Sequence, residues 1–116
     1  MRLELPYPPS SNKYWRRSGV HMHKSNEARA YQAQVALIAK TQLPPGTKPR
    51  EGEVWLEVHV RRPAKRGDLD NSLKVLLDAL KGIAFVDDSQ VVELHAYRMD
   101  DREAPGVTVR VFEAGE

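Results

Sequence analysis

Residues 54–61 read VWLEVHVR, and this stretch decides the fold. Small apolar side chains occupy every second position of the stretch, at Val54, Leu56, Val58 and Val60. Successive side chains of a strand point to opposite faces, so this alternation predicts a strand that is buried on one side. The stretch therefore supplies one wall of a core, and the rest of the chain must supply elements that cover it.

A helix is predicted after this strand, beyond a basic turn at residues 63–67. Apolar residues then recur at intervals of one, three and four, at Leu69, Leu73, Leu76, Leu77, Leu80 and Ile83. These intervals place them on one helical face, and Gly82 is a typical helix terminator. A second helix is predicted over residues 26–42, where apolar residues share one face at Ala28, Tyr31, Val35, Ile38 and Ala39.

The remaining segments complete an α+β pattern. Short strands are predicted at residues 2–6, 90–99 and 107–111 from alternation or β-branched content, whereas residues 13–24 have no clear period and are expected to form a loop. The order β-α-β-α-β-β predicts a small mixed sheet with two main helices. A chain of 116 residues is the size of one domain, so we expect a single domain over 1–116.

Composition narrows the class of protein. Hydrophobic residues make up 41% and charged residues 29%, which suits a globular domain with one core. Cysteine is absent, which excludes disulfides and thiolate metal sites. No apolar run approaches the roughly 20 residues that a membrane helix needs, and the N-terminus lacks the apolar core of a secretory signal. We therefore expect a cytoplasmic protein without membrane contact.

The basic residues are clustered although the net charge is only +2. One cluster comprises Lys13, Arg16, Arg17 and Lys24, and a second comprises Arg61, Arg62, Lys65 and Arg66. Cations beside an acidic site are what an enzyme acting on a polyanion needs, because they hold phosphates. An ordinary surface of mixed charge is the alternative interpretation.

Two pairs of acidic residues are candidates for chemistry. Asp68 and Asp70, two apart in a segment expected to be extended, would point the same way, with Lys74 one helical turn beyond Asp70. Asp87 and Asp88 follow the helix, and folding of the helix against its neighbouring strand would bring their loop toward Asp68 and Asp70. Each pair alone is more simply explained by helix caps, turns or an exposed ion pair.

Together, these acids suit a metal site. Carboxylate oxygens without thiolates favour a hard cation such as Mg²⁺, which shares its coordination sites with water and phosphate. A metal would relieve the repulsion between carboxylates and would generate the attacking hydroxide, while Lys74 would neutralise charge on the phosphate. The sequence therefore favours a metal-dependent nuclease.

Two other features are weaker candidates. His21 and His23 alternate and are a possible transition-metal pair, although histidines in a basic loop more often contact phosphate or solvent. Tyr14 and Trp15 are suited to stacking on an unpaired base, but partial burial in a core explains them equally well.

Three elements of the chain, taken together, resemble the RusA family of Holliday-junction resolvases. They are Pro8-Pro9-Ser10-Ser11-Asn12-Lys13-Tyr14-Trp15, Gly67-Asp68-Leu69-Asp70-Asn71-Ser72-Leu73-Lys74 followed by Asp78-Ala79-Leu80, and Phe85-Val86-Asp87-Asp88-Ser89-Gln90-Val91. They occur in the order and at the separations typical of that family. The resemblance covers nearly the whole chain.

The resemblance implies a homodimeric α+β endonuclease that cuts four-way DNA junctions by paired, symmetric nicks in recombination and repair. It implies Mg²⁺ as the cofactor, with Mn²⁺ as a substitute, and a metal-bound water that attacks the scissile phosphate. The implied metal ligands are Asp68, Asp70 and Asp88, with Lys74 as a further catalytic residue and Asp87 as a possible ligand or support. The DNA-binding residues that we expect are Asn12, Lys13, Tyr14, Arg16, Arg17, Arg62, Lys65 and Arg66.

Two other functions remain compatible with the sequence. A module that binds branched DNA without cutting it would keep the basic clusters and make the carboxylates incidental. A metal-dependent nuclease acting on flaps, other branched DNA or nucleotides would keep both. For the leading hypothesis, the source would be a bacterium or a phage.

Overall fold

The computed structural model describes residues 1–9, 15–18, 21–24, 26–63 and 69–115, and for 15–18, 21–24 and 69–71 it describes the backbone alone. Four strands form the main sheet in the order β1 (Arg2–Leu5), β6 (Gly106–Glu113), β4 (Val54–Arg62), β5 (Val91–Asp100). β4 and β5 are parallel, whereas β6 is antiparallel to both β1 and β4. The sheet is therefore mixed, as the sequence predicted.

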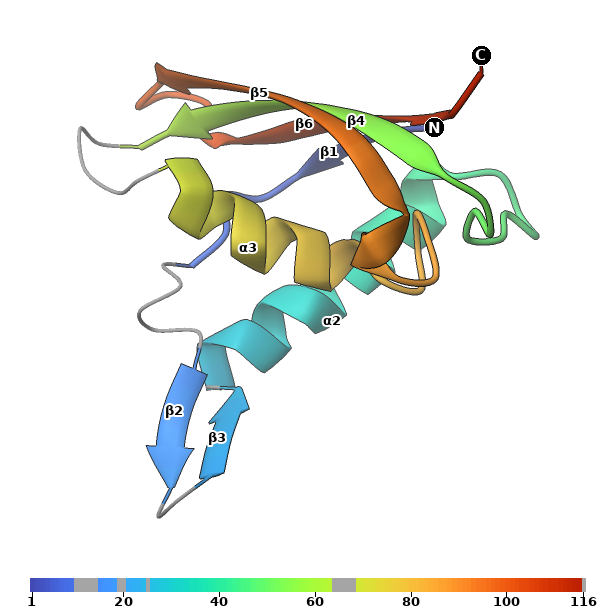
Figure 1. Ribbon diagram of the computed structural model, residues 1–116. Coiled ribbons are helices and arrows are strands. Elements are labelled where there is room, and N and C mark those ends of the chain that lie inside the picture. The colour runs from blue at the N-terminus through green and yellow to red at the C-terminus, as the bar shows by residue number, and fades with distance from the viewer. Residues whose placement is uncertain (10–14, 19–20, 25, 64–68, 116) are drawn as a thin grey trace.

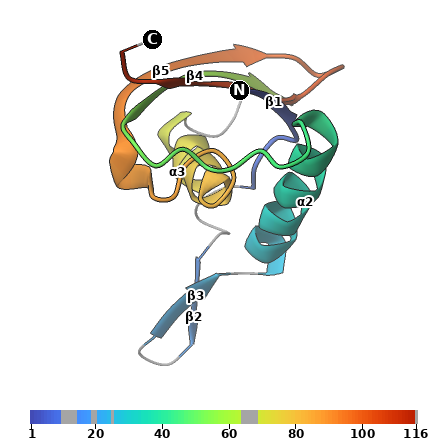
Figure 2. The ribbon, with the colours of Figure 1, turned by 90° about the vertical axis from the view of Figure 1, so that its right-hand side faces the viewer.

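Both main helices, α2 (Asn26–Gln42) and α3 (Leu69–Leu80), cover the same face of this sheet (Figure 1). Figure 2 shows α3 beneath the strands and α2 beside it. The α+β class and the order of the helices and strands predicted from sequence are thus confirmed. No helix in the part of the chain that the structure describes is long and apolar enough to span a membrane.

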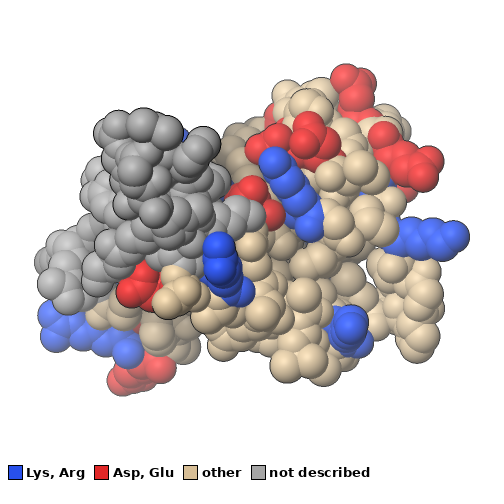
Figure 3. Space-filling model, turned by 90° about the horizontal axis from the view of Figure 1, so that it is seen from below, with Lys and Arg blue, Asp and Glu red and all other residues tan. Residues whose placement is uncertain are grey.

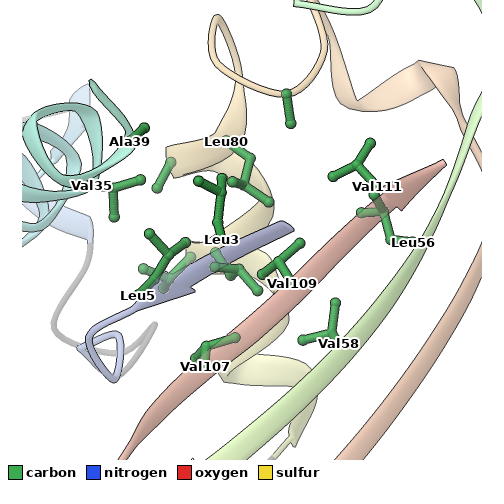
Figure 4. Close-up of a cluster of buried hydrophobic side chains, with 14 of the residues drawn as sticks. Leu3, Leu5, Val35, Ala39, Leu56, Val58, Leu80, Val107, Val109 and Val111 are labelled. Carbon is green, nitrogen blue, oxygen red and sulfur yellow. The ribbon is translucent and has the colours of Figure 1, made fainter. Parts of the chain in front are cut away.

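The core lies between the sheet and the two helices. The alternating residues of β4 are fully buried, and they meet apolar side chains from β1, β6, α2 and α3 (Figure 4). Leu76 and Leu80 of α3 are completely buried, and truncating either to alanine would cost about 2–5 kcal/mol. This packing fixes α3 against the sheet and so fixes where its two ends lie.

β4, α3 and β5 form a parallel βαβ unit. α3 begins beneath the end of β4 and runs back toward the start of β5, which it reaches through a loop and the short 3₁₀ helix η1 (Asp88–Gln90) (Figure 1). The loop packs inward through Phe85, which is completely buried. The start of α3 therefore lies near the carboxyl ends of β4 and β5, and its end lies near the first residues of β5.

A β-hairpin occupies the region that the sequence predicted to be a loop. β2 (Trp15–Ser18) and β3 (His21–Lys24) pair antiparallel, with Trp15 opposite Lys24 and Ser18 opposite His21. They form a separate two-stranded sheet that extends away from the main body (Figure 2). Prediction of a loop was wrong because β2 and β3 pair with each other outside the main sheet, and their sequences lack the apolar alternation by which a core strand is recognised.

Contacts of two side chains tie α2 to β1 and to Pro6, the residue that follows β1. The Tyr31 hydroxyl donates to the Pro6 carbonyl at 2.9 Å, and burial of Tyr31 raises the pKa of its hydroxyl, which stays neutral. At the end of α2, the Gln42 amide accepts from the Glu4 N–H and donates to the Glu4 carbonyl, both at 2.8 Å. The free edge of β1 is thereby hydrogen-bonded to a side chain of the helix.

Candidate active site

The start of α3 carries the first group of predicted acids. Asp70 is the second residue of α3, so the expectation of an extended segment at Asp70 was wrong. Leu69 is in helical phase with Leu73, four residues later, which explains why the helix begins before Asp70. Asp68 lies outside the described residues, as do the side-chain positions of 69–71. Lys74, one turn farther along, is exposed to solvent.

The second group of acids lies on a loop that is fixed by hydrogen bonds. Asp87 caps η1: its carboxylate accepts from the Ser89 N–H at 3.1 Å. The Gln90 amide oxygen accepts from the Val86 and Asp87 N–H groups at 2.9 and 2.8 Å. This reciprocal arrangement is a capping box, and it holds Asp88 in the first turn of η1.

Gln90 also ties this loop to the segment that enters β4. Its amide nitrogen donates to the carbonyls of Arg50 and Gly52 at 2.8 and 2.7 Å. Four hydrogen bonds thus converge on one side-chain amide, two through its oxygen and two through its nitrogen, which is its full capacity as a donor. Sequence reasoning overlooked Gln90, although the spacing Asp87-x-x-Gln90 is itself a capping-box signal.

Lys81 lies at the centre of the acids at this end of α3. Its ammonium is 3.8 Å from one carboxylate oxygen of each of Asp78, Asp87 and Asp88. Asp78 also accepts a 2.6 Å hydrogen bond from Gln32 of α2. Figure 3, the view from the helix side, shows acidic side chains next to basic ones on this face of the molecule. A surface hollow of about 430 Å³ adjoins the cluster and is lined in part by Gln32, Asp78 and Lys81.

Electrostatics keep Asp87 ionised. Hydrogen bonds from the Ser89 side chain and N–H, with the Lys81 charge nearby, hold the pKa of Asp87 below its ordinary value. Both Asp87 and Asp88 are about half exposed, so their carboxylates are accessible from solvent. The ionised Asp87 carboxylate and the accessible Asp88 carboxylate, on a loop fixed by hydrogen bonds, offer oxygen ligands of the kind that a hard cation prefers.

The two groups of acids lie at opposite ends of α3 within one chain. From Asp70 to Leu80 the helix rises about 15 Å, at 1.5 Å per residue. Asp88 lies near Lys81, which directly follows Leu80. The structure does not bring the Asp87–Asp88 loop beside the start of α3, contrary to the expectation from sequence. The helix runs the length of the sheet instead of turning back, because its apolar face packs along the whole core.

Within the described ranges, no three histidine or acidic residues are grouped so that they could hold a metal ion. Oxygen donors of the right chemistry are present at Asp87 and Asp88, but they supply two residues only. The donor set therefore fits Mg²⁺ in kind, and it needs further carboxylates to be complete. Asp68 and Asp70 could supply these carboxylates only if a contact outside the single chain placed them beside Asp88.

The predicted DNA-binding residues are distributed over three regions. Arg16 and Arg17 belong to β2, for which the backbone is described. The Arg62 side chain is largely buried, and its Nε donates to Asp100 at 2.7 Å, so a phosphate would have to share this guanidinium with Asp100. The other predicted residues lie outside the described ranges: Asn12, Lys13, Tyr14, Lys65 and Arg66. The alternative metal pair, His21 and His23, lies on β3, again with backbone alone.

Comparison with known proteins identifies the family. The family model of endodeoxyribonuclease RusA matches residues 6–112. The chain is 32% identical to crossover junction endodeoxyribonuclease RusA of Escherichia coli (strain K12) over 114 residues, covering 97% of this chain and 94% of that protein. The proteins of that name from Enterobacteria phage 82 and Shigella sonnei (strain Ss046) match with the same identity and coverage. The RusA resemblance is thus confirmed, and the chain belongs to the endodeoxyribonuclease RusA family.

Proposed function

We propose that this protein is a Mg²⁺-dependent endonuclease that resolves four-way DNA junctions by paired, symmetric nicks. The observation that carries the proposal is the family match over residues 6–112, which includes every acid of the candidate site. The relatives from bacteria and a phage are named crossover junction endodeoxyribonucleases. A cytoplasmic location and a single catalytic domain over the whole chain belong to the same proposal.

Asp68, Asp70 and Asp88 would hold the metal, with Asp87 beside them. When bound, Mg²⁺ neutralises phosphate charge and activates water for attack, and Mn²⁺ can replace it because it accepts similar oxygen ligands. Lys74 lies one turn beyond Asp70, exposed to solvent, and would stabilise the negative charge that develops on the phosphate. The chain's own contribution is to hold the carboxylates, orient the phosphate and present Lys74 to it.

A homodimer would reunite acids that one chain keeps apart. Asp70 is at the start of α3, which lies toward the carboxyl end of β5 (Figure 1), whereas Asp88 precedes the first residue of β5, Val91. If two copies of β5 paired antiparallel about a two-fold axis, the start of each strand would lie beside the end of the other. Asp88 of the partner subunit would then approach Asp68 and Asp70 of the first subunit. Two such sites, related by symmetry, are what paired nicks require.

β5 has the features of an edge strand that pairs with a strand of another chain. It is a ten-residue edge strand, and among the described strands only β4 pairs with it. Large apolar side chains on it are exposed: Val92 54%, Leu94 37%, Tyr97 51% and Met99 50%. Exposed apolar groups along a long edge favour strand addition, because both main-chain hydrogen bonds and apolar burial are then gained.

Phosphate binding is assigned to the basic residues. The hairpin of β2 and β3 extends from the body and carries Arg16 and Arg17 in its first strand. Lys65 and Arg66 precede the first acid, Asp68, with only Gly67 between, which would place them close to the scissile phosphate in this scheme. Asn12, Lys13, Tyr14 and Arg62 complete the proposed DNA-binding set, and salt-dependent affinity is expected from such contacts.

Cleavage of an end-labelled four-way junction tests the proposal. Wild type should introduce symmetric nicks in Mg²⁺, none in EDTA, and none in a linear duplex of the same sequence. Asp70→Asn should abolish cleavage and leave junction binding intact, because affinity rests on the basic residues. Cleavage by Asp70→Asn at the wild-type rate would overturn the ligand set.

The same assay separates the two alternatives. Tight junction binding without cleavage in either Mg²⁺ or Mn²⁺ would indicate a module that binds branched DNA. Faster cleavage of a flap or a nucleotide than of the junction would indicate a nuclease of broader or different substrate class.

A further inference from the structure

The outer face of the main sheet is the face turned away from both main helices. Figure 1 and Figure 2 show α2 and α3 beneath the strands, and none of the described helices and strands covers the opposite face. On β4, the side chains of this outer face are Trp55, Glu57, His59 and Arg61, which alternate with the buried core residues. Aromatic and charged side chains therefore line a face that a ligand can reach.

Two arginines oppose each other on this face, at a cost in stability. Arg2 of β1 is directly opposite Arg110 of β6, and like charges at opposite positions destabilise a sheet. Their side chains are 68% and 48% exposed. Glu4 lies 3.1 Å from Arg2 and 3.3 Å from Arg61, and Glu57 lies 3.8 Å from Arg110. Three guanidiniums thus share two carboxylates, which leaves this group with a net charge of +1.

A surface hollow of about 380 Å³ adjoins these arginines. Its lining residues are Arg2, Glu57, His59, Thr108 and Arg110. The Glu57 carboxylate is hydrogen-bonded to His59 Nε2 at 3.0 Å, so part of its accepting capacity is already used within the sheet. Guanidinium groups bind phosphate oxygens well, because they present several N–H donors in a fixed plane. The hollow therefore offers donors to a phosphate group.

Aromatic rings lie on both sides of the Glu57–Arg110 row of the sheet. Trp55 stacks on Phe112 with ring centroids 4.1 Å apart, and His59 stacks on Tyr97 at 4.8 Å. Unpaired bases stack on aromatic side chains with little regard to sequence, whereas the bases of a duplex are already stacked on one another. Cations that bind phosphates beside rings that stack on bases are the combination found in proteins that bind single strands.

We propose that the outer face of the main sheet binds single-stranded DNA, with Arg2 and Arg110 on the phosphates and the rings of Trp55, Phe112 and His59 against unpaired bases. DNA is the expected nucleic acid because the chain belongs to a family of endodeoxyribonucleases. The positive charge would attract an acidic peptide as well, but such a peptide would leave the stacking rings without a partner.

This surface is separate from the candidate active site. The acids of that site that the structure describes belong to α3 and to the loop and short helix that follow it. Binding on the outer face requires no metal ion and no cleavage. The inference therefore goes beyond the proposed function, and it can fail while the proposed function holds.

Binding of a fluorescein-labelled oligothymidylate of about ten nucleotides tests the inference. Anisotropy is measured with the full-length protein in EDTA, so that neither metal nor cleavage contributes. At about 0.1 M salt, Arg2→Gln/Arg110→Gln should weaken binding about tenfold or more. The slope of log affinity against log salt should become shallower by about 1.4, because each phosphate contact on a single strand contributes about 0.7. Arg29→Gln/Lys48→Gln removes two exposed cations outside the sheet, and this matched control should bind like wild type.

Tryptophan fluorescence locates the bound strand. The chain has two tryptophans, Trp15 and Trp55, so the emission of Trp15→Phe comes from Trp55 alone. The oligothymidylate should quench this emission with the midpoint of the anisotropy titration, and a duplex should not quench it. Phe112→Leu, shown to be folded by thermal unfolding, should weaken binding about five- to 100-fold and leave the salt slope unchanged, because it removes a ring and no charge.

Two results would overturn the site: Trp55 emission that the oligothymidylate does not quench, or equal affinities of the double arginine variant and its control. Equal quenching by a duplex would contradict the recognition of unpaired bases. Displacement of the oligothymidylate by polyglutamate as readily as by unlabelled oligothymidylate would indicate a surface for acidic peptides instead. A change of oligomeric state in the double arginine variant, measured by light scattering, would indicate that a second copy of the chain covers this face.

Discussion

The two edge strands of the sheet are treated in opposite ways. β1 has four residues, and both of its apolar side chains are buried. On its outer edge, the N–H and carbonyl of Glu4 are both hydrogen-bonded to the Gln42 side-chain amide. β5 has ten residues, carries four exposed apolar side chains, and is paired with β4 alone among the described strands. One edge is closed by its own chain, and the other is left open.

This difference indicates where a second copy would bind. Proteins commonly protect sheet edges by shortness, charge or covering groups, because an open edge invites pairing with another chain. β1 is protected by two of these devices, whereas the apolar residues of β5 would make an unpaired edge a liability. β5 also runs between the two ends of α3, where the separated acids lie. Pairing of a second copy of β5 along this edge would therefore bring the two groups of acids together.

Placing a charge on the open edge should have the largest effect. Leu94→Lys should convert the protein to a monomer and reduce junction cleavage about 100-fold or more, because each site would lose a ligand-bearing partner. Light scattering coupled to size exclusion measures the first effect and the labelled-junction assay the second. Leu37→Lys, at a residue of α2 that is 66% exposed, is the matched control and should change neither. A Leu94→Lys monomer that cleaves normally would refute the role of β5.

Loss of Gln90, which anchors the loop before β5, should have the second-largest effect. Gln90→Leu removes four hydrogen bonds and leaves their backbone partners at Arg50, Gly52, Val86 and Asp87 without the amide. We expect a loss of about 2–4 kcal/mol in the free energy of unfolding, measured with urea, together with weaker Mn²⁺ binding. Gln34→Leu, at an exposed position of α2, should lose little by comparison. Equal losses in the two variants would mean that Gln90 does not anchor the loop.

Removing the Gln42 side chain from the outer edge of β1 should have a smaller effect. Gln42→Ala removes both side-chain hydrogen bonds to Glu4 and should lower the free energy of unfolding by about 1 kcal/mol. Hydrogen exchange at the Glu4 amide should become faster, since that N–H would then face solvent. Unaltered exchange would show that the edge is protected by something other than Gln42.

The smallest effect concerns the pH dependence of stability at the start of η1. The folded-state pKa of Asp87 is depressed, so its ionised form stabilises the fold above about pH 4 and this contribution is lost as the pH falls through the folded pKa. Asp87→Asn can still cap η1 but does not titrate. Below about pH 4, wild type should therefore lose stability more steeply than Asp87→Asn in urea unfolding. Parallel curves would contradict the depressed pKa.

The sequence predicted the elements that build the main sheet and its two helices, and overlooked the hairpin that lies outside the main sheet. The alternation of β4 and the helical spacing in α2 and α3 follow from burial, and the structure confirms these elements. The β2–β3 hairpin lies outside the main sheet and its sequence has no apolar alternation, so hydrophobic periodicity could not reveal it. The dipeptide Ser18-Gly19 between two short polar segments was the available signal for a turn.

The candidate site was only partly predictable for a different reason. Motif and spacing predicted Asp70 and Asp88 as site residues, but their separation depends on how far α3 extends along the sheet. A residue that acts through geometry was overlooked: Gln90 is recognised by its four hydrogen bonds. These cannot be read from residue type alone.

Subunit complementation tests the shared site most directly. Asp70→Asn and Asp88→Asn subunits, differently tagged, are coexpressed and the heterodimer is purified. If the acids of each site come from two subunits, one site of this heterodimer carries both changes and the other is intact. The account predicts that each parental homodimer is inactive and that the heterodimer nicks one strand of the junction. A heterodimer as inactive as its parents would contradict the account, because each site would then take all its acids from one chain.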